Sequence, residues 1–161
     1  MDKDIKIRKI TLEDIDDVVR LEESNFAHPW KRADFEDLTD KDDRGCVVAE
    51  PVADHAGDKE AGINTRIIGC VVYRNIVGDV DITNVQVDKA FRRQGIARAL
   101  MTEAMDCARA AGGERFTLEV RASNSPAIAL YESLGFVSEG IRPNFYEQPC
   151  EDAVIMWKWQ D

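Results

Sequence analysis

A basic stretch that contains a glycine, residues 92–97 (RRQGIA), follows the apolar residues 85–87 and precedes an amphipathic segment. In the order strand, turn and helix, such a stretch exposes the unpaired backbone N–H groups of the first helical turn, at the positive end of the helix dipole. Gly95 lets a ligand approach the backbone without a Cβ in the way, and the arginines of the stretch together with Arg98 add positive charge. The pattern predicts a site for a diphosphate, although the motif alone is weakly specific.

Two side chains further along are of types that transfer protons in enzymes. Glu119 lies in the alternating segment 115–120, whose apolar residues share one face. The carboxylate then points to the opposite face, near the carboxyl end of a strand, where α/β proteins commonly bind ligands. Tyr131 lies on the apolar face of a predicted helix. The residue pattern alone favours a salt-bridged or solvated glutamate and a core tyrosine.

The elements that must position these residues follow the order β-α-α-β-β-β-α-β-α-β-β, which predicts one mixed α/β layer fold. Residues 1–161 are expected to form a single domain, because their length fits one core and no linker interrupts them. The polar segment Pro51–Thr65 is expected to be an enlarged hairpin loop. The predicted strands cover residues 5–10, 45–50, 66–73, 79–87, 115–120, 136–141 and 153–159, the last two around a long loop with Pro143 and Pro149.

Helix-end signals place the helices between these strands. The first helix is expected to begin at Thr11 as N-cap, with Asp14 completing a partial capping box, and the second to cover residues 31–38. The last helix is expected to have Ser125 as N-cap and to end at Gly135. The buried face of the helix after the glycine turn is predicted to contain Ile96, Leu100, Ala104 and Ala108.

The chain is acidic, with 21 basic and 31 acidic side chains and a net charge of −10. Nucleic acid is therefore disfavoured as a direct partner, since phosphate binding relies on a basic surface. An amine or a basic peptide is the more natural electrostatic partner, although an acidic surface also serves solubility alone. No apolar run is long enough to span a bilayer, and the first residues lack the layout of a signal peptide. We expect a cytoplasmic protein that does not associate with membranes.

Cysteines and histidines are few and scattered. The four cysteines form no C-x-x-C pair, and Cys46 and Cys70 each lie in a Gly-Cys-Val-Val stretch typical of a buried strand. We expect Cys46, Cys70, Cys107 and Cys150 to be reduced core residues. The two histidines are too isolated for a zinc site, and no metal cofactor is expected.

Taken together, these motifs resemble the GCN5-related N-acetyltransferase (GNAT) superfamily. Within it they are most similar to the RimI branch, the ribosomal-protein N-alpha-acetyltransferases. The likeness is dense from about residue 81 onward, and Pro29-Trp30 also fits the branch. The matching segments are residues 84–88 (NVQVD), 92–100 (RRQGIARAL), 118–124 (LEVRASN), 127–136 (AIALYESLGF) and 151–156 (EDAVIM).

The resemblance implies a fold and a reaction. The fold is a central, mostly antiparallel sheet with helices on both faces. The reaction is direct transfer of an acetyl group from acetyl-CoA to the α-amine of the N-terminal residue, alanine, of a small-subunit ribosomal protein. It implies that Glu119 is the general base, working through a water, and that Tyr131 protonates the departing thiolate. The implied cofactor contacts are Val85, Gln86, Val87, Arg92, Arg93, Gln94, Gly95, Ile96, Ala97, Arg98 and Asn124.

The acceptor site is less closely defined than the donor site. The family's final strand-pair loop shapes the peptide site, and the candidates there are Arg142, Asn144 and Tyr146, each of which also fits ordinary loop surface. In the family, the position of Gln86 often holds a small apolar residue, and the position of Ala97 more commonly holds a second glycine. Two alternatives stay open: a GNAT enzyme acting on lysine side chains or a small amine, and a coenzyme A-binding module without catalysis.

Overall fold

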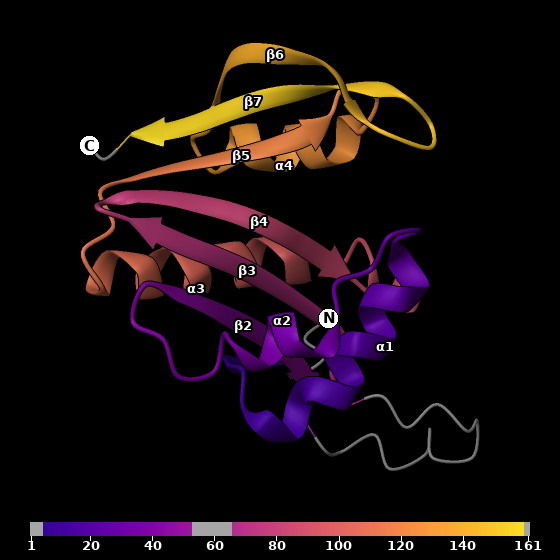
Figure 1. Ribbon diagram of the computed structural model, residues 1–161, viewed down its shortest axis with the longest axis vertical. Helices are drawn as coiled ribbons and strands as arrows, with labels where there is room; N and C mark the ends of the chain where they lie inside the picture. Colours follow the sequence, from indigo (N-terminus) through magenta and orange to yellow (C-terminus); the bar gives the residue numbers. More distant parts are fainter. Residues whose placement is uncertain (1–4, 53–65, 160–161) are drawn as a thin grey trace.

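The computed structural model describes residues 5–52 and 66–159, whose strands form one seven-stranded sheet in the order β1-β2-β3-β4-β5-β7-β6 (Figure 1). The loop predicted at 51–65 therefore lies outside the described residues from residue 53 onward, while Pro51 itself ends a strand. The strands are β1 (Ile5–Lys9), β2 (Arg44–Pro51), β3 (Gly69–Ile76), β4 (Asp79–Val87), β5 (Arg115–Arg121), β6 (Val137–Tyr146) and β7 (Glu151–Trp159).

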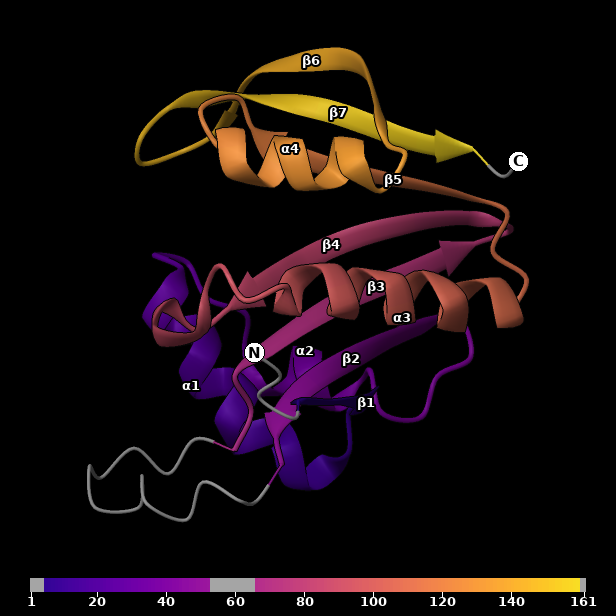
Figure 2. The ribbon, with the colours of Figure 1, turned by 180° about the vertical axis from the view of Figure 1, so that it is seen from behind.

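The helices cover both faces of this sheet. α3 and α4 lie on one face and α1 and α2 on the other (Figure 2). Neighbouring strands run antiparallel except β4 and β5, which are parallel, so the predicted element order and the mostly antiparallel sheet are confirmed. The helices are α1 (Ile15–Asn25), α2 (Arg32–Glu36), α3 (Ile96–Ala110) and α4 (Ser125–Ser133), with short 3-10 turns η1 (Leu12–Asp14) and η3 (Lys89–Phe91).

Each face of the sheet has its own apolar core. On the α3 face, the predicted helix residues Ile96, Leu100, Ala104 and Ala108 are all buried against alternate residues of the strands. On the α1 face, Phe35 of α2 and the first turns of α1 pack on Cys46 and Cys70. Because burial of apolar area is the main favourable term in folding, these two layers fix which way each strand residue points.

A bulge interrupts the pairing of β4 with β3. Val72 pairs with Asn84 and the next residue, Tyr73, pairs with Ile82, so Thr83 is an extra residue on β4. Ile82 faces the α3 core before the bulge, and Val85 packs against the same core after it. The extra residue therefore shifts the alternation by one place and turns Asn84 toward the α1 face.

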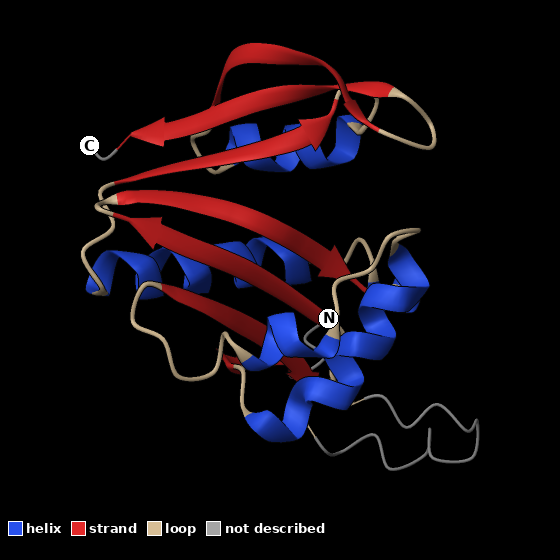
Figure 3. Cartoon of the chain, viewed as in Figure 1, coloured by secondary structure: helices blue, strands red, loops and turns tan. Residues whose placement is uncertain are grey.

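The last two strands differ from their predicted extent. β6 continues through Pro143 to Tyr146, and the connection to β7 is a short turn at residues 147–150 in place of the predicted long loop (Figure 3). Among the described strands β6 pairs with β7 alone, and proline is tolerated on such an edge because no partner needs its missing N–H. The register is irregular between Arg142 and Tyr146, which accommodates the proline.

Smaller boundary predictions were also wrong. α2 is shorter than residues 31–38, and the segment predicted as a strand from residue 66 becomes a strand only at Gly69. Asn124, not Ser125, is the N-cap of α4, because its side chain accepts a hydrogen bond from the Ala127 backbone N–H at 3.3 Å. Asparagine and serine are comparably good N-caps, so when the two are adjacent the sequence does not decide which of them begins the helix.

The cysteines are free thiols, as expected, but they do not all lie in the core. Cys46 and Cys70 are buried, Cys107 is half-buried, and Cys150 is exposed in the turn between β6 and β7. The expectation that Cys150 is a core residue is therefore wrong, because its segment forms a surface turn. No helix among the described residues is long and apolar enough to cross a membrane.

A buried carboxylate ties β1, η1 and the chain after residue 65 together. Asp14 is fully buried and accepts hydrogen bonds from Arg8 at 2.6 and 2.8 Å, from Arg66 at 2.7 Å and from the Thr11 backbone N–H at 2.8 Å. Burial alone would raise the pKa of Asp14, but the hydrogen bonds from Arg8, Thr11 and Arg66 outweigh it and hold the pKa well below its ordinary value.

We predict that Asp14→Asn lowers the free energy of unfolding by about 3–5 kcal/mol at neutral pH, because two arginines then face a neutral amide. A folded-state pKa below the unfolded value means that the carboxylate stabilises the fold above about pH 4 and that this contribution is lost as the pH falls further. Urea denaturation at a series of pH values measures the gap between the two proteins, which should shrink on acidification.

Asp16→Asn is the matched control for this prediction. Asp16 also pairs with an arginine, Arg32, but both side chains are exposed, so the free energy of unfolding should stay near that of the wild type. Equal destabilisation by the two substitutions would contradict the role assigned to Asp14.

Candidate active site

A cleft of about 790 Å³ opens at the carboxyl end of β4. Its walls come from the end of β4, the turn before α3, one side of α4 and the end of α1. The lining residues are Asn25, Phe26, Val85, Gln86, Val87, Phe91, Arg92, Arg93, Gly95, Ile96, Ala97, Arg98, Asn124, Pro126, Ala127, Leu130 and Tyr131.

One wall of the cleft is the N-terminal turn of α3. Gly95 is the N-cap residue and has a φ of 78°, a left-handed conformation that favours glycine. A Cβ built at this position would meet no atom within 4 Å, so the backbone conformation, rather than crowding within the protein, requires glycine here. A 15-residue helix thus begins directly at the cleft with its first N–H groups unpaired in the helix, which suits an anionic group.

The arginines of this turn are held by different partners. The Arg92 Nε donates to the Val87 carbonyl oxygen at 3.1 Å, which fixes the side chain against the end of β4. The Arg98 Nη2 donates to the Ser133 Oγ at 2.6 Å, which links α3 to α4 across the cleft. Guanidinium groups keep spare donors after one hydrogen bond, so both can still attract a phosphate. The residues present therefore fit a diphosphate-bearing cofactor.

Tyr131 forms part of the floor of the cleft. It is 6% exposed, and its ring packs edge-to-face on Phe136 with the ring centroids 6.1 Å apart. Burial, with a smaller effect from Tyr146, raises the pKa of Tyr131 to about 12. The phenol is therefore protonated at neutral pH and can donate a hydrogen bond, and its proton, to an anion held against it. Tyr131 is thus a core aromatic, as the residue pattern predicts, and it also lines the cleft, while its role as the acid stays a prediction.

Glu119 lies on the opposite face of the sheet from α3 and α4. Its neighbours Leu118 and Val120 pack in the α3 core, so the carboxylate of Glu119 is turned away from that core, as its alternation predicts. The side chain is 28% exposed, and its Oε1 lies 3.4 Å from the Arg142 Nε. Burial and the negative charge of Glu119 both raise the pKa of Tyr146, which places that ring in the same group.

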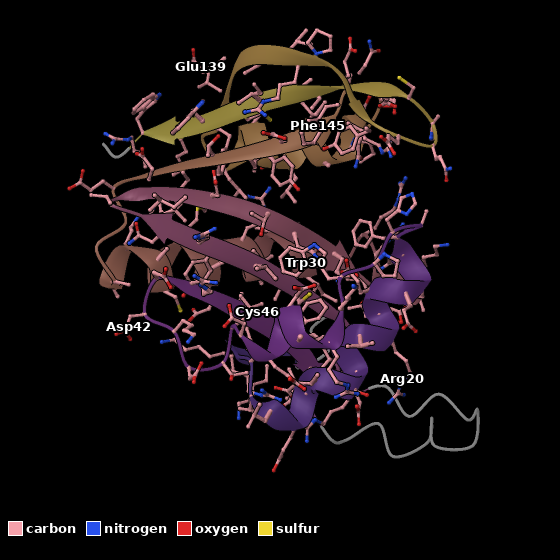
Figure 4. The ribbon with its side chains drawn as sticks, viewed as in Figure 1. Arg20, Trp30, Asp42, Cys46, Glu139 and Phe145 are labelled. Atoms are coloured by element: carbon pink, nitrogen blue, oxygen red, sulfur yellow. The ribbon has the colours of Figure 1, made fainter. Side chains whose placement is uncertain are left out.

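β4 and β5 separate beyond their last paired residues. The parallel pairing ends at Ile82 and Leu118, and beyond this pair the strands diverge toward their carboxyl ends (Figure 1). Figure 4 places Trp30 on the β4 side and Phe145 on the β5 side of the opening. The cleft is lined by β4 residues beyond this pair, whereas Glu119 follows Leu118 on β5 and is not part of the lining.

The predicted site residues divide into two groups by position. Most of the predicted cofactor contacts line the cleft, and Asn124 does so while its side-chain oxygen caps α4. Gln94 is exposed in the turn and is not part of the lining. Outside the lining, on the β5–β7 side, are Glu119, Arg142, Asn144 and Tyr146.

A buried polar cluster that was not predicted from the sequence lies beside the cleft. Glu22 is 2% exposed and accepts hydrogen bonds from Asn84 at 2.8 Å and from Gln86 at 2.7 Å, while its other oxygen accepts the Trp30 backbone N–H at 3.1 Å. The Gln86 side-chain oxygen in turn accepts a hydrogen bond from Asn25 at 3.0 Å. The cluster explains why a glutamine replaces an apolar residue at position 86: its amide pairs with a buried carboxylate.

A sequence signal for this cluster does exist. Apolar residues occupy even positions in β4 up to Ile82 and odd positions from Val85, so the alternation itself reveals the bulge that turns Asn84 and Gln86 inward. Asn84 Oδ1 is the one buried side-chain polar atom that has no hydrogen-bond partner within residues 5–52 and 66–159.

Comparison with known proteins agrees with this geometry. Residues 15–136 match the acetyltransferase (GNAT) family. A Bacillus subtilis protein provisionally named ribosomal protein bS18-alanine N-acetyltransferase is 33% identical over 94% of this chain and 93% of its own length. The Escherichia coli ribosomal protein bS18-alanine N-acetyltransferase is 40% identical over 58% of this chain and 64% of that protein.

Solved structures share the fold. The crystal structure of the Escherichia coli ribosomal-protein-S18-alanine N-acetyltransferase superposes with a TM-score of 0.79 at 29% identity, covering 96% of this chain and 93% of that one. Arabidopsis thaliana NAA60 in complex with acetyl-CoA superposes with a TM-score of 0.83 at 20% identity, covering 96% and 98% of the two chains. At that identity the second likeness establishes the fold alone.

The glycine at the start of α3 leads to a test of the anion site. We predict that Gly95→Ala raises the KM for acetyl-CoA about tenfold, because the left-handed conformation costs an alanine about 1–2 kcal/mol and the turn shifts to avoid it. Steady-state kinetics with varied acetyl-CoA measures this change.

Gly112→Ala is the matched control for the turn. Gly112 lies just beyond the other end of α3, has a φ of 95° and also has nothing within 4 Å of a built Cβ. Both variants should lose similar stability, but only Gly95→Ala should change the KM for acetyl-CoA. An unchanged KM in Gly95→Ala would count against the site.

Proposed function

The chain belongs to the acetyltransferase (GNAT) family, and from this premise we propose that it acetylates the N-terminal alanine of ribosomal protein bS18, with acetyl-CoA as donor. The observation that carries the proposal is the cleft that fits the donor: its lining includes the part of β4 beyond the last β4–β5 pair, and β5, the next strand of the sheet, carries Glu119. The substrate follows the names of the Bacillus subtilis and Escherichia coli relatives, which match 94% and 58% of this chain.

The cleft residues account for binding of the donor. The backbone N–H groups at the start of α3 hold the diphosphate, with Arg93 and Arg98 supplying charge. The backbone of residues 85–87, beyond the last β4–β5 pair, has polar groups available to hold the pantetheine arm as a neighbouring strand would. Acetyl-CoA supplies the activated acetyl thioester, and one backbone amide of this segment stabilises the oxyanion that develops during transfer.

Two side chains carry the proton transfers. Glu119 takes a proton from the acceptor ammonium through a water, so that the neutral nitrogen can attack the thioester carbonyl, and the second proton that this nitrogen loses as the amide forms passes to water. Tyr131, whose phenol is protonated at neutral pH, gives its proton to the thiolate released when the carbon–sulfur bond breaks and regains one from water. The two groups belong to opposite faces of the sheet, and no covalent acyl-enzyme is needed.

The pKa of the acceptor favours an α-amine over a lysine. An α-amine has a pKa of about 7.7–8.0 and a lysine about 10.4, a gap of about 2.5 units or 3.4 kcal/mol in deprotonation. A carboxylate is a weak base and suits the more acidic ammonium. The net charge of −10 also favours a basic peptide such as the N-terminus of a ribosomal protein.

Substitution of the two proton-transferring residues tests the mechanism. We predict that Glu119→Gln and Tyr131→Phe each lower kcat by about 10²–10⁴-fold with little change in the KM for acetyl-CoA, because each removes one proton transfer. Stopped-assay kinetics on a peptide acceptor measures both constants. Near wild-type turnover in both variants, with the cofactor still bound, would exclude the assigned roles.

The chain offers a matched control for each variant. Tyr73 is also buried at 6% exposure, and burial raises its pKa to about 12, but it lies on β3 outside the cleft. Glu139 is an exposed residue of β6, labelled in Figure 4. Tyr73→Phe and Glu139→Gln should leave kcat within about twofold of the wild type, since neither faces the cleft.

The acceptor is tested by mass spectrometry on a panel of peptides. We predict acetylation at the α-amine of peptides that begin with alanine and carry the bS18 sequence, and loss of that product when the N-terminus is blocked. Acetylation of internal lysines or of a polyamine in place of the α-amine would favour the alternative of a GNAT enzyme with a side-chain or small-molecule acceptor.

A further inference from the structure

The turn between β6 and β7 is tied to β5 by a single arginine. Arg121 lies two residues after Glu119 on the same face of β5, at the carboxyl end of the strand. Its Nη1 donates to the Pro149 carbonyl oxygen at 3.0 Å and its Nη2 to the Glu147 carbonyl oxygen at 3.3 Å. Both terminal nitrogens of one side chain therefore bind the backbone of the turn.

The same guanidinium also packs on the end of β6. Its Cζ lies 4.3 Å from the centroid of the Tyr146 ring, within the range of a cation–π interaction. Tyr146 precedes the turn directly and is close enough to Glu119 for the carboxylate to influence its ionisation. The arginine thus links three things: the strand that carries the base, the turn, and the aromatic residue beside the base.

Neighbouring contacts hold the far side of the turn. The Ser123 backbone N–H and hydroxyl donate to Glu151, the first residue of β7, at 2.8 and 2.6 Å. The Asn144 backbone N–H donates to the Asp152 carboxylate at 2.9 Å, which closes the irregular part of β6. Within the turn, the Cys150 Sγ donates to the Asn144 Oδ1 at 3.4 Å, a contact between side chains, so among residues 5–52 and 66–159 Arg121 is the side chain that holds the backbone of residues 147–150.

We propose that Arg121 is a positioning residue, which holds the β6–β7 turn and Tyr146 in place beside Glu119 and so shapes the acceptor side of the site. The inference rests on the proposed function in one respect, namely that the acceptor peptide approaches on the Glu119 face. Arg121 needs no contact with the acceptor, since it acts through the turn and the Tyr146 ring. Charge-assisted hydrogen bonds and a stacked guanidinium are the contacts that lysine cannot reproduce in full.

A spin label on Cys150 tests the positioning role without any substrate. Cys150 lies exposed in the turn, whereas Cys46 and Cys70 are buried, so a Cys107→Ser background directs the label to one site. We expect Arg121→Ala to increase the mobile component of the electron paramagnetic resonance spectrum. Arg121→Lys, which keeps the cation over Tyr146 but cannot span both carbonyls, should give an intermediate spectrum and serves also if the alanine variant does not fold.

Kinetics with the unlabelled protein supplies the second readout. Arg121→Ala should raise the KM for the acceptor peptide about tenfold, the factor that corresponds to one lost charge-assisted hydrogen bond. The kcat and the KM for acetyl-CoA should stay within about twofold, because the donor cleft is built by other residues. Partial recovery of the peptide KM in Arg121→Lys would support positioning through the ring and the turn.

Arg115→Ala is the matched control at the other end of β5. Arg115 lies on the same face, pairs with Asp79 and stacks on Trp159 with its Cζ 5.9 Å from the ring centroid, far from the turn. It should leave both the spectrum and the peptide KM unchanged.

An unchanged spectrum in Arg121→Ala, or a uniform loss of kcat with both KM values raised, would overturn the proposal. Failure of the wild type to acetylate any peptide would instead reject the proposed function, and the label would still decide the role of Arg121.

Discussion

The separation of β4 and β5 is the constraint on which the rest of the site depends. The strands pair as far as Ile82 and Leu118 and then diverge, because each is held by different neighbours. Glu22 holds the far half of β4 toward α1 through Asn84 and Gln86, and pairing with β7 holds β5 as far as Arg121. Since a continuous sheet would keep the two faces apart, the proposed mechanism, which uses residues of both faces, depends on this separation and on the buried polar contacts that maintain it.

The gap also separates two kinds of chemical environment. On the α3 face, Tyr131 is buried in an apolar core, which keeps its phenol neutral. On the other face, Glu119 is partly exposed, and its Oε1 lies 3.4 Å from the Arg142 Nε. The proposed mechanism uses the buried phenol as the proton donor and the more exposed carboxylate as the base. The two proposed roles therefore differ in the solvation of the side chain as well as in residue type.

Much of this arrangement follows from periodicity, and the exceptions have local causes. The buried face of α3 and the outward direction of Glu119 were predictable because each lies in a regular element with one apolar face. The burial of Glu22 was not, since an acidic residue in an amphipathic helix normally faces water, and the break in alternation that signals the bulge in β4 does not say which side chain Asn84 and Gln86 meet. The extension of β6 through Pro143 depends on that strand being at the edge, a tertiary fact that residue preferences do not contain.

That edge position has a consequence for the solubility of the protein. An edge strand offers free backbone groups to which another chain can add, and the apolar Val137 and Ile141 are exposed on β6. Pro143, which has no N–H to donate, and the irregular register from Arg142 to Tyr146 interrupt the straight ladder that such an addition requires. The irregular end of β6 thus makes this edge of the sheet a poor template for edge-to-edge aggregation.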